Sequence, residues 1–163
     1  MDVHIREMLP ADASEWLRMR LALWPDEPEG HAEAIRQYFA GHRHEPRHVL
    51  LAVDATQRAV GFAELSIRNI VDGCDTDRVA YLEGWYVDPG ARRAGAGRAL
   101  VVAAEEWALD EGCTEFGSDA LIDNHVSHAA HRALGFEEVD RVVTFRKDLP
   151  RRQTSPTTSD PSR

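Results

Sequence analysis

The segment that decides the fold reads Arg92-Arg93-Ala94-Gly95-Ala96-Gly97-Arg98-Ala99-Leu100. It lies between a strand-like run that ends at Val87 and a run with helical periodicity. The first amides of a helix have no partner within the helix, and the helix dipole adds partial positive charge there. The two glycines leave room for an anion to approach those amides, and the three arginines add charge. The segment therefore predicts an anion site; the alternative is a glycine-rich connection that binds nothing.

The spacing of the glycines excludes two common phosphate-binding loops. Gly-x-Gly-x-x-Gly would need a third glycine at Ala99 or Leu100, and the nucleotide-binding P-loop would need Gly-Lys-Ser/Thr. An Arg-x-x-Gly-x-Gly turn directly after Val87-Asp88-Pro89 instead resembles the acetyl-CoA-binding turn of the GNAT superfamily of N-acetyltransferases. The resemblance implies that this turn binds the coenzyme through Arg92, Arg93, Ala94, Gly95, Ala96, Gly97 and Arg98.

Composition limits the partners that we expect. The chain has 163 residues, 28 of them acidic and 19 basic, for a net charge of -9. A nucleic-acid partner is not expected, because phosphate binding needs a basic face, whereas acidic side chains would attract a cationic substrate. No membrane association is expected, since no apolar run approaches the roughly 20 residues that span a bilayer.

The N-terminus has no signal pattern, so we expect a cytoplasmic protein. Cys74 and Cys113 are too few for a disulfide framework and lack metal-ligand spacing, so no metal site is expected.

Hydrophobic periodicity predicts an α/β (α+β) fold with a mixed, mostly antiparallel sheet and about four helices. Strands are expected at residues 3–8, 49–53, 59–68, 79–87, 114–118, 136–139 and 141–147, and helices at 10–23, 31–41, 97–110 and 125–134. This order is that of the GNAT fold. We expect one acetyltransferase domain over residues 1–149 and a disordered tail over 150–163, where Pro, Ser, Thr and charged residues cannot form a core.

A second motif strengthens the resemblance. Asn124-x-x-Ser127-x-x-x-His131-x-x-x-Gly135-Phe136 is similar to the fourth helix of the family, Asn-x-x-Ala-x-x-x-Tyr-x-x-x-Gly-Phe. The family pattern implies that Asn124 bonds the pantetheine arm of the coenzyme; the alternative is a plain helix cap. His131 replaces the tyrosine that protonates the CoA thiolate in many relatives. An imidazole titrates in a useful range for that role, or it only packs in the helix.

The family fold also implies roles for the strand before the turn. The backbone of Trp85 and Val87 is expected to hold the pantetheine arm as an extra strand, with an amide near Trp85 as the oxyanion donor.

Shorter matches resemble the aminoglycoside 6'-N-acetyltransferases, and best their chromosomally encoded dimeric branch. This resemblance implies acetyl-CoA and an aminoglycoside as substrates, antibiotic resistance, and a homodimer formed through the terminal strands. Ile70 departs from the branch, which often has a tyrosine in this loop. The matching segments are Leu23-Trp24-Pro25, Ser66-Ile67-Arg68, Gly73-Cys74-Asp75, Leu82-Glu83-Gly84, Ser118-Asp119, Leu134-Gly135-Phe136-Glu137-Glu138 and Arg141-Val142.

Two carboxylates are candidates for work on the acceptor amine, which must be held and deprotonated. Glu83 is costly to bury in an otherwise apolar strand, where Tyr81 and Trp85 are expected to share its face. Asp119 follows the strand that should lie beside it, so both could converge on one ammonium group. The alternatives are an arginine-paired glutamate and a capping aspartate.

Three further residues are candidates for substrate binding. Trp24 would form a wall for a sugar ring beside the acidic loop that contains Glu27, and Asp72 would add a secondary contact for a polycation. The alternatives are a core tryptophan and solvated acids.

Together these features favour an acetyl-CoA-dependent acetyltransferase that modifies the 6'-amine of aminoglycosides. Transfer is expected to be direct, within a ternary complex, because neither cysteine lies in the predicted site. One alternative is a GNAT enzyme for another small cationic amine, such as a polyamine or an amino sugar. The other is a non-catalytic acetyl-CoA sensor, which would not need Glu83 and Asp119.

Overall fold

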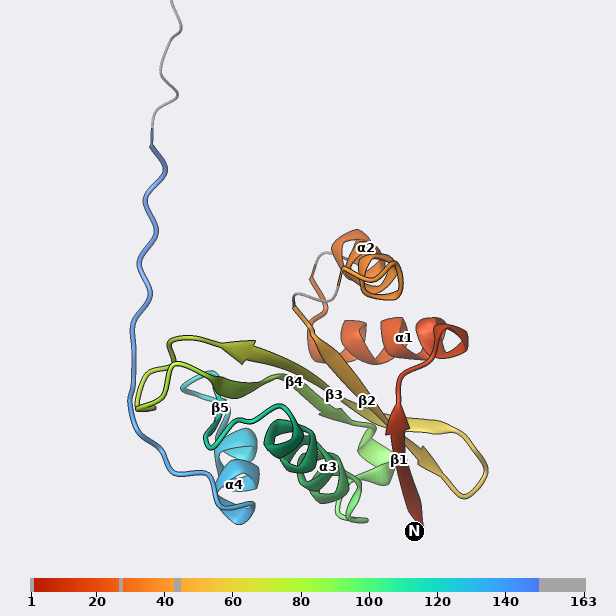
Figure 1. Ribbon diagram of the computed structural model, residues 1–163. Helices are drawn as coiled ribbons and strands as arrows, with labels where there is room; N and C mark the ends of the chain where they lie inside the picture. The colour runs from red at the N-terminus through yellow and green to blue at the C-terminus, as the bar shows by residue number, and fades with distance from the viewer. Residues whose placement is uncertain (1, 27, 43–44, 150–163) are drawn as a thin grey trace, which may run out of the picture.

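A five-stranded sheet with helices on both faces forms the body of the molecule, as the computed structural model shows (Figure 1). The structure describes residues 2–26, 28–42 and 45–149. The strands are β1 (Val3–Glu7), β2 (His48–Asp54), β3 (Ala59–Arg68), β4 (Val79–Val87) and β5 (Phe116–Ser118), and the helices are α1 (Ala13–Leu23), α2 (Pro28–Phe39), α3 (Ala96–Asp110) and α4 (His125–Ala133). Two 3-10 turns, η1 (Pro10–Asp12) and η2 (Pro89–Ala91), precede α1 and α3.

The strands follow chain order in the sheet, β1-β2-β3-β4-β5. Neighbours are antiparallel up to β4, whereas β4 and β5 are parallel because α3 connects them. The mixed, mostly antiparallel sheet predicted from the sequence is confirmed. Helix α2 begins at Pro28, earlier than predicted, because proline is well tolerated in a first helical turn.

Each face of the sheet has its own hydrophobic core. Helices α1 and α2 cover one face and α3 and α4 the other (Figure 1). On the α1/α2 side, Trp16 and Met19 pack on Phe62 and Tyr86. On the other side, Leu100 of α3 packs against Leu65 and Leu82 of the sheet. The candidate site combines a cavity on the α1/α2 side with the end of the β4–β5 pairing.

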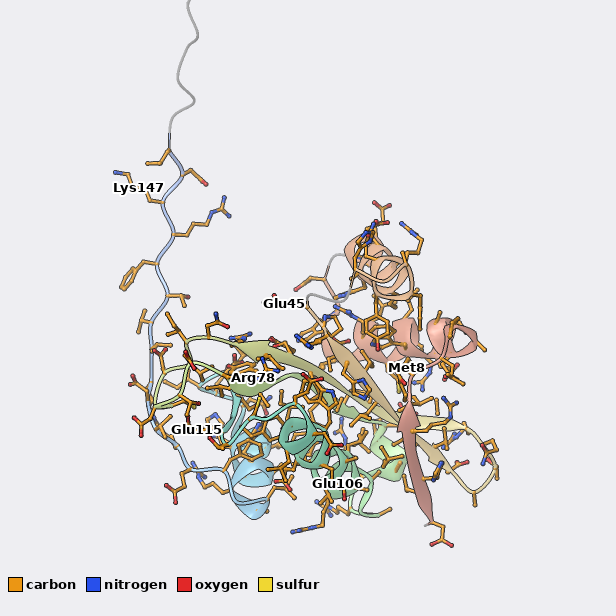
Figure 2. The ribbon with its side chains drawn as sticks, viewed as in Figure 1. Met8, Glu45, Arg78, Glu106, Glu115 and Lys147 are labelled. Atoms are coloured by element: carbon orange, nitrogen blue, oxygen red, sulfur yellow. The ribbon has the colours of Figure 1, made fainter. Side chains whose placement is uncertain are left out.

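The two last predicted strands are wrong for this chain. No strand is assigned to the described residues 137–149, which run away from the sheet as an extended segment, hereafter the arm (Figure 1). A β-strand needs a neighbouring strand for its hydrogen bonds, and the arm has none here. Figure 2 shows Lys147 on the arm, far from the sheet. The predicted tail, residues 150–163, lies outside the described residues.

Candidate active site

The Arg/Gly turn contains two residues with left-handed backbone conformation. Gly95 is the residue before α3 and is left-handed, with φ +90°, and Arg93 is also left-handed, with φ +63°. No side chain caps the start of α3 in the described structure, so its first amides stay open to an anion. A Cβ on Gly95 would meet nothing within 4 Å, whereas one on Gly97 would lie 3.0 Å from the Trp85 indole. Gly97 therefore admits the Trp85 ring.

The arginines of the turn divide into two groups. Arg92 donates to the Val87 carbonyl at 3.0 Å, and Arg98 donates to the Ala133 carbonyl at 3.1 Å. These bonds fix the turn to the end of β4 and to the C-terminus of α4. All three arginines are exposed, and no partner for Arg93 is present among the described residues. The turn is therefore a positively charged surface, braced by two of its own arginines.

Strands β4 and β5 pair over three residues and then separate. Their pairing runs from Ala80–Phe116 to Leu82–Ser118 and stops there. Residues 83–87 of β4 have no strand partner on that side in the described structure. Trp85 contributes an indole Nε1 that is buried without a hydrogen-bond partner. The backbone edge of Trp85 and Val87 thus has the form needed to bind an extended ligand.

A register shift at Glu83 changes which side chains share a face. Glu64 pairs with Gly84 and Leu65 with Leu82, so Glu83 is an extra residue in β4. Trp85 consequently packs on the α3 side with Leu82, and the prediction that it shares a face with Glu83 is wrong. Side chains therefore do not alternate strictly between the two faces of the sheet at this bulge.

Glu83 is tied to the preceding strand. Arg68 donates to its carboxylate from Nε at 2.9 Å and from Nη2 at 2.5 Å, and the Ser66 hydroxyl donates a further hydrogen bond. The Glu83 side chain is 18% exposed. The arginine-paired arrangement considered as an alternative is therefore present, and the carboxylate still reaches solvent beside a cavity.

Asp119 connects to Glu83 through two intervening side chains. The Tyr81 hydroxyl donates to the Asp119 carboxylate at 2.7 Å, and the Arg68 guanidinium lies 3.6 Å from the Tyr81 ring centre. Burial and the nearby Asp119 carboxylate raise the pKa of Tyr81, so its hydroxyl keeps its proton and remains a donor. Arg68 and Tyr81 thus join the two predicted acceptor-site carboxylates.

His131 lies in α4 against the strand gap. Its Nε2 is 2.9 Å from Ser118 Oγ and its Nδ1 is 2.8 Å from the Ser127 carbonyl oxygen. The ring packs edge-on against Trp85. Asn124 accepts a hydrogen bond from the Ser127 amide at 3.1 Å, so it is the N-cap of α4.

Trp24 forms one wall of a cavity of about 370 Å³ that contains Glu83. Its ring stacks on His31 with centroids 6.1 Å apart, and a Cβ on Gly84 would lie 2.4 Å from it. Glu45 lies on the α1/α2 side of the sheet (Figure 2). The cavity is lined by Arg20, Trp24, His31, Glu45, Pro46, Glu64 and Glu83.

Two of these lining residues, Trp24 and Glu83, are predicted from the sequence. Glu64, like Glu83, is a lone carboxylate in an apolar strand, so the same pattern could have predicted it as a site residue. Arg20, His31 and Glu45 come from helices and a loop whose approach no local pattern predicts. Asp72 is exposed on the β3–β4 loop and does not line the cavity. Glu27 lies outside the described residues.

Glu64 lies at the buried floor of this cavity, with 2% of its surface exposed. Trp16 Nε1 donates to it at 2.7 Å, and Arg20 Nη1 lies 3.3 Å from the same carboxylate oxygen. Burial raises the pKa of Glu64 to about 7, against the opposing effects of Arg20 and Trp16, and Glu83 adds to the rise. A protonated Glu64 reduces the negative charge beneath Glu83.

Glu64 should make the folded protein less stable as the pH rises. The pKa of Glu64 is about 7 in the folded state, against 4.5 for an ordinary glutamate, so the folded state binds this proton more tightly than the unfolded state does. The proton therefore stabilises the folded protein fully below about pH 4.5, and this stabilisation is lost as the pH rises through about 7. Relative to Glu64→Gln, which cannot titrate, the wild-type free energy of unfolding should fall by about 2–3 kcal/mol between roughly pH 5 and pH 8. Urea unfolding of both proteins measures this, and a constant difference would contradict it.

The described residues contain no cluster of three potential metal-ligating side chains. No helix in the described part of the chain is long and apolar enough to cross a membrane.

Comparison with known proteins identifies the family. Residues 13–136 match the model of the acetyltransferase (GNAT) family. An aminoglycoside N(6')-acetyltransferase type 1 from Klebsiella aerogenes is 49% identical over 146 residues, which cover 89% of this chain and 96% of the relative. The crystal structure of the 6'-N-acetyltransferase AAC(6')-Ih from Acinetobacter baumannii has a TM-score of 0.83 at 43% identity, covering 91% of this chain and 100% of that one.

A further solved structure is AAC(6')-Iy in complex with the bisubstrate analogue CoA-S-monomethyl-acetylneamine. It has a TM-score of 0.83 at 35% identity and covers 91% of this chain and 100% of that one. The family match, the extent of these similarities and the shared fold lead to one conclusion: the chain belongs to the GNAT family of acetyltransferases.

Proposed function

We propose that the protein transfers the acetyl group of acetyl-CoA to the 6'-amine of aminoglycosides. The observation that carries this proposal is the cavity beside the β4–β5 gap, whose lining includes Trp24 and the carboxylates of Glu45 and Glu83. Carboxylates attract an ammonium group, and an aromatic wall suits the apolar face of a sugar ring. Relatives of this length and identity are named as aminoglycoside acetyltransferases, which supports the same substrate class.

The residues at the gap fit acetyl-CoA. The open amides at the start of α3 and the exposed arginines suit the pyrophosphate, and the unpaired edge of β4 at Trp85 and Val87 suits the pantetheine arm. Asn124 Oδ1 already caps α4, which leaves its amide nitrogen as the donor to that arm. A neighbour structure of AAC(6')-Iy is in complex with CoA, which supports this coenzyme as the ligand.

In the proposed reaction, Glu83 and Asp119 hold the substrate ammonium, and Glu83 accepts its proton directly or through water. The amine attacks the thioester carbonyl, a backbone amide near Trp85 stabilises the oxyanion, and the carbon–sulfur bond breaks as the new carbon–nitrogen bond forms. His131 is the source of the proton that the CoA sulfur receives. In the absence of a cationic substrate, the Arg68 guanidinium balances the negative charge of the Glu83 carboxylate.

The cysteines support direct transfer. Cys113 is buried with 3% of its surface exposed, and Cys74 lies in the β3–β4 loop. Burial, together with Glu115 and Asp75, raises the pKa of the Cys74 thiol, so it is a poor nucleophile. Neither cysteine lines the cavity.

A thiol-release assay with acetyl-CoA tests the proposal against kanamycin, tobramycin, spermidine and glucosamine. Turnover confined to aminoglycosides with a 6'-amine supports it, and product analysis then identifies the acetylated amine. Turnover with spermidine or glucosamine alone would show that the site acetylates a different class of amine. Binding of acetyl-CoA without any turnover would instead favour a sensor.

We also propose a cytoplasmic homodimer that forms through the arm. The arm presents a β-rich sequence whose apolar side chains are exposed, with Phe145 at 93%. An extended chain with free backbone groups and exposed apolar residues is ready to pair with a second sheet. The exposed apolar residues of the arm are Val139, Val142, Val143, Phe145 and Leu149.

Deletion of residues 141–163 should convert the dimer to a monomer. Light scattering coupled to gel filtration measures the mass, and deletion of residues 150–163 alone is the matched control, which should remain dimeric. Phe145→Asp should weaken the dimer in the full-length chain, because it introduces a charge into the buried contact. A monomeric wild-type protein would refute this proposal.

A further inference from the structure

Ser118 and His131 form a hydrogen-bonded pair where β4 and β5 separate. Ser118 is the last residue of β5, opposite Leu82 in the final strand pair. Its Oγ lies 2.9 Å from His131 Nε2, and its other contact, to the Leu82 carbonyl, is longer at 3.4 Å. The hydroxyl therefore lies at the end of the gap where the β4 backbone becomes available.

The His131 ring is held from its other nitrogen. Nδ1 lies 2.8 Å from the Ser127 carbonyl oxygen, which can only accept, so Nδ1 carries a proton. In the neutral ring, Nε2 therefore accepts the hydrogen bond from Ser118. Trp85 and Phe136 pack edge-on against the ring at 5.5 Å and 5.2 Å between centroids, which restricts its rotation. His131 is thus aimed at Ser118.

We propose that Ser118 is the catalytic residue that gives a proton to the CoA sulfur, with His131 as the positioning residue that replaces this proton. The inference rests on the proposed function, because it requires the thioester to lie in the β4–β5 gap. A serine hydroxyl cannot give up its proton at neutral pH unless a second group replaces it, and His131 Nε2 is within reach to do so.

The transfer moves one proton from His131 through Ser118 to the CoA sulfur. The His131 imidazolium donates its Nε2 proton to Ser118 Oγ, while the original hydroxyl proton passes to sulfur as the carbon–sulfur bond breaks. The products are neutral His131, an intact Ser118 hydroxyl and the CoA thiol. The ring, which is half-buried, then regains a proton from solvent.

Ser118→Ala tests the relay by separating turnover from binding. It should lower kcat about tenfold to a hundredfold, the weak end of general acid catalysis, because a thiolate is already a fair leaving group. The KM values for acetyl-CoA and the aminoglycoside should change less than about twofold, since the hydroxyl acts in the transition state. Ser118→Thr keeps a hydroxyl and should recover most of the activity. Ser14→Ala, an exposed serine on α1, is the matched control.

His131→Gln distinguishes a relay from two separate effects. It should lower kcat by a similar factor, and the double variant should lose no more than either single variant, because the two side chains act as one unit. Losses that multiply, or full activity in Ser118→Ala, would overturn the relay. If Ser118→Ala fails to fold, Ser118→Thr with normal kcat beside an impaired His131→Gln supports it, and an inactive but folded Ser118→Thr opposes it.

The same pair could in principle act as a nucleophile and its base. Intact-mass measurement after incubation with acetyl-CoA alone separates the two roles: unchanged protein supports the relay, and an acetyl group on Ser118 overturns it. These outcomes differ from failure of the proposed function, in which the wild-type enzyme itself does not acetylate aminoglycosides.

Discussion

Glu83→Gln should lower kcat/KM for aminoglycosides by about a hundredfold to ten-thousandfold, the range of general base catalysis. The amide cannot accept the proton of the substrate ammonium, and it removes a negative charge from the cavity. The binding of acetyl-CoA should be nearly unchanged, because Trp85 and Val87 pack on the α3 side of the sheet, whereas Glu83 lines the cavity on the α1/α2 side. Steady-state kinetics and calorimetric titration with acetyl-CoA measure the two quantities.

Two further variants make this prediction specific to Glu83 and its proposed partner. Glu15→Gln removes a different arginine-paired glutamate, which is on the surface of α1 and bonds Arg18, so it should leave activity intact. Asp119→Asn should also impair acceptor use more than coenzyme binding. Unchanged aminoglycoside kinetics in both Glu83→Gln and Asp119→Asn would refute the assigned roles.

The Arg68 pair offers a second interpretation of Glu83, as a structural ion pair. If that were its only role, Glu83→Gln would lower the free energy of unfolding, and Arg68→Ala would reproduce the kinetic loss. In the proposed mechanism, Arg68→Ala leaves the Glu83 carboxylate and its hydrogen bond from Ser66, and so retains far more activity than Glu83→Gln. Urea unfolding of both variants decides between these interpretations.

Trp16→Ala should be the most destabilising single substitution in the α1/α2 core. Trp16 is fully buried and packs edge-on against Tyr38 and Phe39 at 5.2 Å and 5.8 Å. Truncation of a buried tryptophan costs about 3–5 kcal/mol, and loss of the indole donor to Glu64 adds about 1–3 kcal/mol. That sum is a large part of the 5–15 kcal/mol typical of a domain. We expect little folded protein at physiological temperature.

Trp16→Phe is the control, since it keeps most of the volume and loses the donor to Glu64. It should fold with a smaller loss of stability, and it should raise the substrate KM because Glu64 and Arg20 line the cavity. Thermal unfolding followed by circular dichroism ranks the three proteins. Equal stability of wild type and Trp16→Ala would contradict the packing described above.

The sequence alone determined those parts of the site that depend on local backbone geometry. Gly95 precedes a helix in a left-handed conformation that other residues rarely adopt, and Asn124 caps its helix through an amide three residues away. The order of strands and helices also follows from local periodicity and local turn residues. The glycine turn before α3, the cap of α4 and the main strands and helices of the sheet could therefore be predicted.

Tertiary structure decided what each polar side chain contacts. The bulge at Glu83 depends on pairing with β3, and it reversed the face predicted for Trp85. Glu64 meets Trp16 and Arg20 only because α1 packs on the sheet, a contact between segments far apart in the chain. Strands were predicted at residues 136–139 and 141–147 from the pattern of apolar residues, but a strand also requires a partner, which residues 137–149 do not have in the described chain. Local sequence preferences determine where helices and strands form. The packing of segments that are distant in the chain determines which polar side chains meet in the site.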